Sequence, residues 1–376
     1  MGELRADAVT AVHVVVPEGI DDPARPSGGN TYDRRVCQGL AALGWAVQEH
    51  PVPGDWPRPG QAAHSALARA ARRIPDDAVV LLDGLIASSA PEALVPQAHR
   101  LRQVVLVHMP LGHRPPEGEA GAVRARERET LAAAAAVVTT SEWCRRRLGE
   151  LYALPAERVH VAEPGVDAAS LAPGSAGGDS LLCVASVTPD KGHDVLLDGL
   201  ATVSDLSWRC ECVGSLVRDA VHADRVRRHA RKGGLAERVR FRGARTGGQL
   251  DRVYAAADLL VLASHAETYG MVVTEALARG LPVLATEAGG VTEALGYAED
   301  GTRPGLLIPA GDPPALGAAL RAWLEDAELR ERLRGAARER RSQLRPWRDT
   351  ASAVADVLAR VRRDVEGVAG LVGAAR

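Results

Sequence analysis

The chain of 376 residues is long enough for two domains, since a domain holds on the order of 100–200 residues. Its 46 basic and 48 acidic residues leave a net charge of −2, and 46% of the residues are hydrophobic. This balance argues against disorder and against a basic nucleic-acid-binding protein. Aromatic residues make up only 3% of the chain, too few to stack single-stranded bases. We therefore expect a globular, multi-domain protein with no nucleic-acid partner.

Cysteine usage and hydropathy predict a cytoplasmic protein. The five cysteines are odd in number and form no Cys-x-x-Cys pair, which argues against a disulfide framework and a thiolate zinc site. The first apolar stretch, Ala11–Val16, is too short and polar for a signal peptide, and no apolar run reaches the ~20 residues of a membrane span. Arg145–Arg147 predicts a solvated helix face, with peripheral contact to an anionic membrane as the alternative.

In the first half of the chain, short apolar runs alternate with helical patterns. Strands are expected at Ala11–Val16, Val79–Leu82, Val104–His108 and Ala136–Thr140, and helices at Tyr32–Leu43 and Arg124–Ala136. This alternation predicts an α/β domain with a parallel sheet and crossover helices.

A stretch rich in glycine and proline, Ala172–Asp179, is expected to be an interdomain linker, after which the pattern restarts. Strands are expected at Leu181–Val184, Ser207–Val213, Val239–Phe241, Leu259–Leu262 and Pro282–Ala285, and helices at Asp194–Val203, Ala220–Lys232, Gln249–Ala256, Val272–Arg279, Pro313–Asp326 and Ala327–Arg341. A last amphipathic helix at Thr350–Val361 needs a partner surface. Two βα domains facing each other are the expected result.

The segment from Ser264 to Val283 follows an expected strand and opens an expected helix. Free amides around Gly270, together with the positive end of the helix dipole, suit a phosphate. Glu275 can accept hydrogen bonds from a pair of ribose hydroxyls, and Glu267 from a hexose. The alternative is that both glutamates are only helix-favouring acids.

Two other strand-loop-helix segments carry candidate ligand contacts. Lys191 is one of only two lysines in the chain and directly precedes a helix, where it can neutralise a diphosphate leaving group. Gly28 and Gly29 allow the backbone to approach a ligand closely. A surface lysine and an ordinary turn are the alternatives. Neither a G-x-G-x-x-G nor a P-loop motif is present, which argues against a dinucleotide oxidoreductase and a P-loop enzyme.

His108 ends an expected strand, where open α/β sheets place ligand contacts, although it can also be a structural residue. The neighbouring His113, Glu117 and Glu119 lack the spacing of metal ligands. We predict no protein-bound metal.

Together these segments resemble the family-4 retaining glycosyltransferases of the GT-B fold over nearly the whole chain. Glu267 and Glu275 match the paired-glutamate motif of that family. Further matches are Phe241–Gly243, Tyr254–Asp258, Gly280–Val283 and Gly289–Glu293. The family's phosphate lysine, interdomain turn, strand-end histidine and glycine loop correspond to Lys191-Gly192, Val166-Asp167, His108 and Gly28-Gly29.

The resemblance implies two Rossmann-like domains across a cleft: residues 1–167 on the acceptor side, 168–345 binding a nucleotide-diphosphate sugar, and a helix in 346–376 returning to the first domain. It also implies hexose transfer with retention by front-face attack, with no enzyme nucleophile, cofactor or metal. The acceptor is open among small molecules, lipids and polysaccharides.

The resemblance also assigns roles to individual residues. His108 and Glu267 would be catalytic, with His108 near the anomeric carbon and Glu267 on the sugar hydroxyls, and Glu275 would hold the ribose. Lys191 and the amides of Tyr269–Met271 would hold the diphosphate. The remaining donor-binding residues would be Gly28, Gly29, Asn30 and Thr268.

Two positions depart from the family pattern. Ser186 stands where the family has a phosphate-binding arginine, and Arg218 is our candidate to replace it. Glu163-Pro164-Gly165 stands where the family has a Pro-Asn-Gly turn. Two further functions therefore stay open: a glycoside phosphorylase on the same scaffold and a non-catalytic nucleotide-sugar-binding protein.

Overall fold

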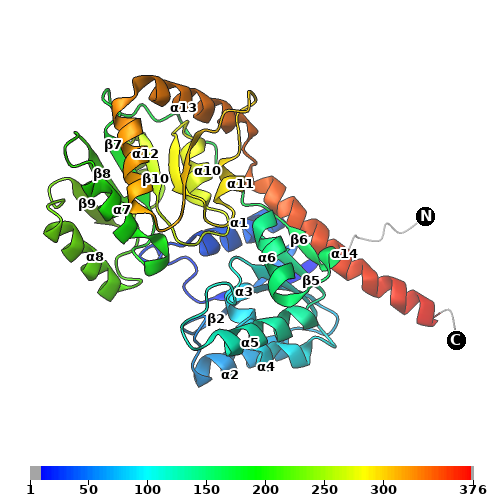
Figure 1. Cartoon of the computed structure of the whole chain (residues 1–376). Coiled ribbons are helices and arrows are strands. Elements are labelled where there is room, and N and C mark those ends of the chain that lie inside the picture. Colours follow the sequence, from blue (N-terminus) through cyan, green and yellow to red (C-terminus); the bar gives the residue numbers. More distant parts are fainter. Residues whose placement is uncertain (1–9, 374–376) are drawn as a thin grey trace. The chain divides into compact units, whose positions relative to one another are not determined.

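The computed structural model describes residues 10–373, with side chains up to Arg363, and the chain forms two compact units (Figure 1). Unit 1 contains the described residues up to Ile20, Gly29–Pro164 and the helix that begins at Trp347. Unit 2 contains Asp21–Gly28 and Gly165–Pro346. The first expected boundary, after residue 167, lies three residues beyond the observed division at Pro164. The second, after residue 345, lies one residue before the observed division at Pro346. The assignment of Asp21–Gly28 to unit 2 was not expected.

The expected linker at Ala172–Asp179 lies inside unit 2, so its interpretation as a linker is wrong. Ser175 Oγ donates to Asp258 Oδ2 at 2.6 Å, and Trp323 Nε1 donates to the Gly178 carbonyl at 2.8 Å. The segment has few apolar side chains because hydrogen bonds, rather than apolar packing, fix it to the unit.

Unit 1 contains a parallel sheet of six strands in the order β2-β1-β3-β4-β5-β6. The strands are β1 (Ala11–Pro17), β2 (Ala46–Val52), β3 (Val79–Asp83), β4 (Arg102–Val107), β5 (Ala136–Thr139) and β6 (Val159–Val161). Alternate residues of β3 enter two different hydrophobic cores, one on each face of the sheet. Burial on both faces explains why these strands are continuous apolar runs.

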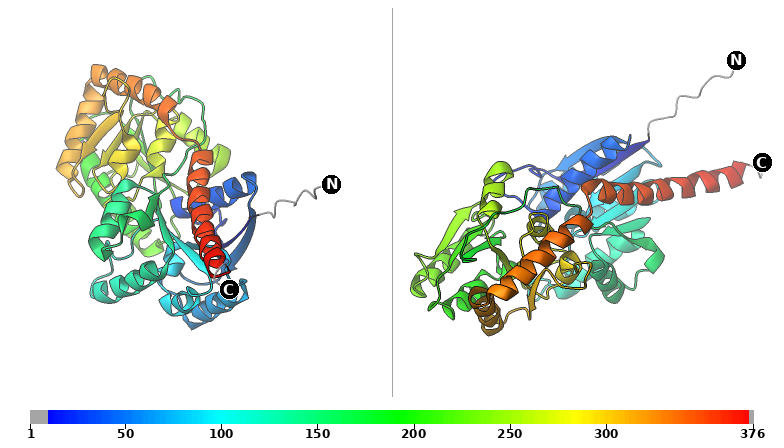
Figure 2. Two further views of the ribbon diagram at one scale, coloured as in Figure 1. Left: turned by 90° about the vertical axis from the view of Figure 1, so that its right-hand side faces the viewer. Right: turned by 90° about the horizontal axis from the view of Figure 1, so that it is seen from above.

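The helices of unit 1 are α1 (Gly28–Ala42), α2 (Gln61–Arg73), α3 (Gly84–Ala87), α4 (Pro91–Leu94), α5 (Ala120–Ala133), α6 (Glu142–Tyr152) and α14 (Trp347–Gly373), with 3-10 turns at Val95–Gln97 and Ala156–Arg158. Helix α14 lies next to α1 (Figure 2), and a Cβ on Gly39 would lie 2.3 Å from the Ala351 Cβ. Val354, Val357, Leu358 and Val361 of α14 are buried in the core that α1 covers. The predicted amphipathic helix therefore finds its partner surface on unit 1.

Unit 2 contains a second parallel six-stranded sheet, in the order β12-β11-β10-β7-β8-β9. Its strands are β7 (Ser180–Val184), β8 (Arg209–Val213), β9 (Val239–Gly243), β10 (Leu259–Leu262), β11 (Val283–Thr286) and β12 (Gly305–Ile308). Its helices are α7 (His193–Ala201), α8 (Ala220–Lys232), α9 (Gly247–Ala255), α10 (Met271–Leu277), α11 (Val291–Leu295), α12 (Pro313–Glu325) and α13 (Ala327–Arg340), with 3-10 turns at Pro189–Lys191 and Arg341–Gln343.

Within residues 10–373, no helix combines the length and the apolar character that crossing a membrane requires.

Candidate functional site

The order of the strands places a candidate site in unit 2 between β7 and β10. These strands are neighbours in the sheet, and the chain runs outward from them in opposite directions. After these loops the chain continues to opposite edges of the sheet, and open α/β sheets bind ligands where the strand order reverses in this way. Lys191 lies in the loop after β7, and Glu267 in the loop after β10.

Close backbone packing brings these two loops together. Gly192 has a φ of +60°, and a Cβ at this position would lie 2.0 Å from the Ala263 carbonyl oxygen. The His265 amide donates to the Asp190 carbonyl at 2.8 Å. Only glycine allows both the left-handed backbone and this approach. Gly192 thus allows the loop that carries Lys191 to pack closely against the loop that carries Glu267.

Lys191 and Glu267 form an ion pair across the two loops. The Lys191 Nζ lies 2.7 Å from Glu267 Oε1 and 3.6 Å from Asp190 Oδ2, and Ser264 Oγ donates to the same Glu267 oxygen at 3.0 Å. The two side chains are 22% and 12% exposed. Burial acts to lower the pKa of Lys191, but the carboxylates of Glu267 and Asp190 outweigh it, so the pKa lies above its usual value and the ammonium group is kept charged.

The loop that carries Glu267 is held from its other side by Gly290. The Gly290 amide donates to the Glu267 carbonyl at 3.1 Å, and a Cβ on Gly290 would lie 2.2 Å from the Thr268 carbonyl oxygen. The loop ends at Gly270, whose φ of +91° starts α10 at Met271. Thr268, Tyr269, Gly270 and Met271 thus lie together at the start of this helix, as expected.

Glu275 lies one turn into α10, where Tyr254 of α9 fixes it. The Tyr254 hydroxyl donates to Glu275 Oε2 at 2.8 Å, and the Tyr254 side chain is fully buried. The Arg279 guanidinium covers the Tyr254 ring at 4.4 Å and donates to the Glu275 carbonyl. Burial raises the pKa of Glu275, while the Tyr254 hydrogen bond and Arg279 act to lower it.

Arg218, the predicted substitute for the missing arginine at Ser186, is exposed on the segment after β8. Burial acts to raise the pKa of Asp190, but Lys191, hydrogen bonds from Thr188 and the backbone and, most weakly, Arg218 outweigh burial, so the pKa is lowered. Arg218 is therefore close enough to the Lys191 loop for its charge to be felt there.

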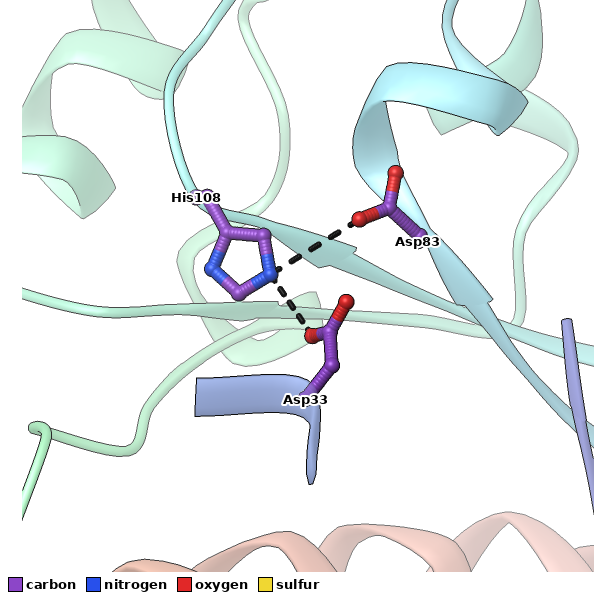
Figure 3. Close-up of side chains that lie close together, drawn as sticks. All are labelled: Asp33, Asp83 and His108. Atoms are coloured by element: carbon purple, nitrogen blue, oxygen red, sulfur yellow. Dashed lines mark hydrogen bonds and ion pairs between the residues drawn. The ribbon is translucent and has the colours of Figure 1, made fainter. Parts of the chain in front are cut away.

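In unit 1, His108 meets two acids that the sequence analysis did not single out (Figure 3). His108 follows β4, Asp83 ends the neighbouring strand β3, and Asp33 lies on α1. His108 Nε2 lies 2.7 Å from Asp33 Oδ1 and 3.8 Å from Asp83 Oδ2. The side chains of both acids are only 3% exposed. Their burial around a histidine at a strand end makes this cluster a second candidate site.

Two glycines make room for this cluster. A Cβ on Gly84 would lie 2.7 Å from the Leu106 carbonyl oxygen, and a Cβ on Gly29 would lie 3.3 Å from the His108 ring. The sequence predicted a helix from Tyr32 with Gly28 and Gly29 in the loop before it, but α1 begins at Gly28. Gly28, Gly29 and Asn30 therefore form the first turn of α1.

The three nearest ligand atoms of Asp33, Asp83 and His108 all lie within 4.8 Å of one another, which could hold a metal ion. The 2.7 Å contact between His108 and Asp33 is, however, a hydrogen-bond length. Ligands 2.0–2.2 Å from a tetrahedral zinc ion would lie about 3.3–3.6 Å apart. The arrangement fits a proton between these two groups better than it fits a metal.

The residues that sequence reasoning missed carried usable signals. Asp83 directly follows the apolar run Val79–Leu82, so the strand-end argument that selected His108 applied to it as well. Asp33 lies among the buried positions of α1, next to Tyr32 and near Val36, which is an unusual place for an acid.

Two family models of glycosyltransferases match this chain, one in each half. Residues 6–170 match Glycosyltransferase Family 4, and residues 175–340 match the family described as glycosyl transferases group 1.

Relatives and solved structures agree with this assignment. A D-inositol 3-phosphate glycosyltransferase of Jonesia denitrificans is 31% identical over 65% of this chain and 62% of its own length, and one of Streptomyces avermitilis is 36% identical over 46% of this chain and 37% of its own length. The chain thus spans about three fifths, or less, of these relatives.

Sucrose-phosphate synthase from Thermosynechococcus elongatus superposes with a TM-score of 0.77 at 20% identity, covering 94% of this chain and 99% of the synthase. Anabaena Alr3699/HepE in complex with UDP-glucose superposes with a TM-score of 0.74 at 18% identity, covering 93% and 99% of the two chains. The expected fold is confirmed: the chain has the GT-B fold and belongs to the family-4 glycosyltransferases.

Proposed function

We propose that this protein transfers a hexose, with retention, from a nucleotide-diphosphate sugar to an acceptor, and that unit 2 binds the donor. The observation that carries the proposal is the Lys191–Glu267 ion pair at the strand-order reversal of unit 2. A cation for a diphosphate and a carboxylate for sugar hydroxyls lie side by side there. The names of the relatives and the UDP-glucose complex of a protein with this fold support the same function.

In this mechanism the bond between the anomeric carbon and the phosphate oxygen breaks, and the acceptor oxygen bonds to that carbon on the same face. The acceptor proton passes to the departing phosphate oxygen. Lys191 and the amides of Tyr269–Met271 stabilise the charge that grows on the diphosphate. Glu267 interacts with a sugar that gains positive character, and Glu275 holds the ribose. No step in this mechanism requires a metal.

The ion pair also defines what donor binding must do to unit 2. Lys191 and Glu267 neutralise each other at 2.7 Å, so a diphosphate competes with Glu267 for the ammonium group. Its binding frees the Glu267 carboxylate to accept hydrogen bonds from the sugar. Donor phosphate and donor sugar are therefore recognised together, because each takes one member of the pair.

Unit 1 supplies the remaining residues of the proposal. We propose that His108 contacts the donor sugar near the anomeric carbon and that Gly28, Gly29 and Asn30, in the first turn of α1, bind the donor. We also propose that the protein acts in the cytoplasm, which agrees with five free cysteines that are all buried.

Arg218 is proposed as the second phosphate cation, in place of the family arginine at Ser186. Replacing Arg218 by Ala should raise the KM for the donor about three- to tenfold, since it removes one exposed charge near the diphosphate. Arg225→Ala, an exposed arginine on α8, is the matched control. Equal donor KM values for the two variants would remove Arg218 from the site.

A melting-temperature panel with UDP, GDP, ADP and dTDP tests the function. A nucleotide at 100 times its dissociation constant stabilises the folded state by about 2.7 kcal/mol. We expect one nucleotide to raise the melting temperature more than the others. Sugar conjugates of that nucleotide are then tested as donors, with D-inositol 3-phosphate as the first acceptor because the relatives are D-inositol 3-phosphate glycosyltransferases. The proton NMR spectrum of the product should show the anomeric configuration of the donor. Stabilisation by inorganic phosphate alone would instead indicate a phosphorylase, and donor binding without turnover a binding protein.

A further inference from the structure

In the cluster of Asp33, Asp83 and His108 in unit 1, two carboxyl groups lie near one histidine ring, although one would be enough to orient it. Two nearly fully buried acids lie against the same ring nitrogen. Burying an ionised carboxylate without a partner is costly, so the protonation states of the three groups must be linked.

The hydrogen bond to Asp33 settles which nitrogen of His108 carries a proton on this side. Asp33 Oδ1 lies 2.7 Å from Nε2, and a carboxylate only accepts, so Nε2 must donate. The ring is held in place by Tyr32, whose ring meets it edge-on at 5.2 Å, and by the close approach of Gly29. Nδ1 is then the nitrogen that remains for a ligand, on a side chain that is 14% exposed.

Asp83 uses its two oxygens differently. Its Oδ1 accepts from the amides of Leu85 and Ile86 at 2.7 and 3.2 Å and so caps α3. Its Oδ2 points toward Asp33 and His108. The second oxygen of Asp33, Oδ2, is buried and has no hydrogen-bond partner among the described residues when both acids are ionised. A proton on Asp83 gives Asp33 a further hydrogen-bond donor, because a carboxylic acid can donate to a carboxylate and the side chains of the two acids are within hydrogen-bonding reach.

Charge balance selects the same arrangement. With Asp33 ionised, His108 doubly protonated and Asp83 neutral, the cluster has no net charge, which suits its burial. Burial, Asp33 and the hydrogen bond between the two acids raise the pKa of Asp83 to about 7, although His108 and the Ile86 amide oppose the rise. Burial acts to lower the pKa of His108, but the charge and the hydrogen bond of Asp33, together with the charge of Asp83 whenever that acid is ionised, outweigh burial and raise it.

We propose that Asp33 is the positioning residue of His108: its carboxylate accepts the Nε2 proton and keeps the ring an imidazolium that presents Nδ1–H to a ligand, while a protonated Asp83 leaves the buried cluster without net charge. The matching ligand is an oxygen acceptor, such as a sugar hydroxyl or a ring oxygen. Only this choice of ligand rests on the proposed function. The positions and protonation states of the three side chains do not.

The groups that face the cluster come from four elements. Helix α1 brings Asp33 together with Tyr32, whose hydroxyl donates to the Ala162 carbonyl, and Cys37. The end of β3 and the start of α3 bring Asp83, and the end of β4 brings His108. Burial keeps the pKa values of Tyr32 and Cys37 above their usual range, so neither competes for the shared proton near neutral pH.

The test is a long-range 1H–15N NMR spectrum of the full chain with 15N-labelled histidine rings, recorded from about pH 5.5 to 8.5. The His108→Gln variant assigns the signals. The wild type should show both His108 nitrogens protonated below the midpoint of the titration and should keep the proton on Nε2 above it. This result needs no substitution at Asp33, so it stands even if a variant fails to fold.

Asp33→Asn should lower the His108 midpoint by about one pH unit or more, that is tenfold or more in the protonation constant. Asp83→Asn keeps the oxygen that caps α3 and should lower the midpoint less. Asp76→Asn, which removes an exposed partner of Arg100 in the same unit, is the matched control and should leave it unchanged.

Three results would overturn the proposal: a neutral His108 that carries its proton on Nδ1, an unchanged midpoint in Asp33→Asn, or Zn²⁺ or Mg²⁺ that shifts the His108 signals at one equivalent only when Asp33 is present. The last result would make the cluster a metal site. If the protein shows transfer, Asp33→Asn should lower kcat more than it changes the donor KM. A protein without transfer would refute the proposed function and leave the NMR result as it is.

Discussion

The two candidate sites hold their charges in different ways. In unit 2, Lys191 and Glu267 lie on neighbouring loops, are partly exposed and neutralise each other directly. In unit 1, Asp33 and Asp83 are almost fully buried and share one histidine, so a proton must balance their charge. A charged ligand can separate a partly exposed ion pair by binding one of its members. A buried cluster without net charge is instead suited to hold one side chain in a single orientation and protonation state.

The largest effect on activity should come from removing the negative charge of Glu267 from the ion pair of unit 2. Glu267→Gln keeps the shape of the side chain but removes the charge that, in the proposed mechanism, stabilises the sugar in the transition state. We expect kcat to fall about 100- to 1,000-fold, or about 3–4 kcal/mol, with a smaller change in the donor KM. Steady-state kinetics measure this, and Glu287→Gln, an exposed glutamate after β11, is the control. Equal kcat values in the two variants would contradict the role of Glu267.

The next effect concerns the packing that makes the ion pair possible. Gly192→Ala places a Cβ 2.0 Å from the Ala263 carbonyl, in a left-handed conformation, so the two loops must move apart. We expect a loss of about 2–3 kcal/mol in the free energy of unfolding, measured with urea. Gly234→Ala has a similar φ of +70° but no atom within 4 Å, and should lose only about 1 kcal/mol. Similar losses in both variants would show that the loops do not pack as described.

The buried cluster of unit 1 should appear in the pH dependence of stability. Because the pKa of Asp83 is raised in the folded state, the folded chain binds more protons than the unfolded chain between about pH 4 and pH 7. Stability therefore falls as the pH rises through this window. Relative to Asp83→Asn, the wild type should lose on the order of 1–2 kcal/mol between pH 5 and pH 8. Urea unfolding at both pH values measures the difference, and parallel curves for the two proteins would exclude a shared proton.

The smallest effect is expected at the hydrogen bond that fixes Glu275. Tyr254→Phe removes the hydroxyl 2.8 Å from Glu275 Oε2 without changing the buried ring. Donor affinity should fall about threefold to tenfold, or about 1 kcal/mol, with kcat nearly unchanged. Calorimetric titration of the donor nucleotide checks this, and Glu275→Gln should weaken binding at least as much. A Tyr254→Phe variant with a changed kcat and unchanged affinity would argue against a ribose role for Glu275.

Sequence reasoning predicted most of the fold because both sheets are buried on both faces, which turns strands into apolar runs. It missed β2, whose central residues Gln48 and Glu49 are exposed at the sheet edge and show no apolar run. It also missed the short strands β6 and β12. The stretch at Ala172–Asp179 misled it, since hydrogen bonds that fix a Gly-rich segment leave no pattern in the residues.

The site in unit 2 could be predicted because its charged residues lie beside glycines in two short segments. The cluster of Asp33, Asp83 and His108 in unit 1 could not be predicted from the sequence. Asp33 and His108 are 75 positions apart in the chain, and Asp83 lies between them. Only the reversal of the sheet order between β1 and β3 brings them together. A residue at a strand end and an acid among the buried positions of a helix are each visible in the sequence, but their meeting is a property of the fold.

The most direct test of the account is whether Lys191 recognises a diphosphate. Calorimetry should compare the nucleoside diphosphate that the melting panel selects with its nucleoside, on the wild type and on Lys191→Met. We predict that the wild type prefers the diphosphate by at least about tenfold, or about 1.4 kcal/mol, and that this preference is largely lost in the variant, while nucleoside affinity is unchanged. An equal preference in both proteins would show that the Lys191–Glu267 pair is only structural and would contradict the proposed donor site.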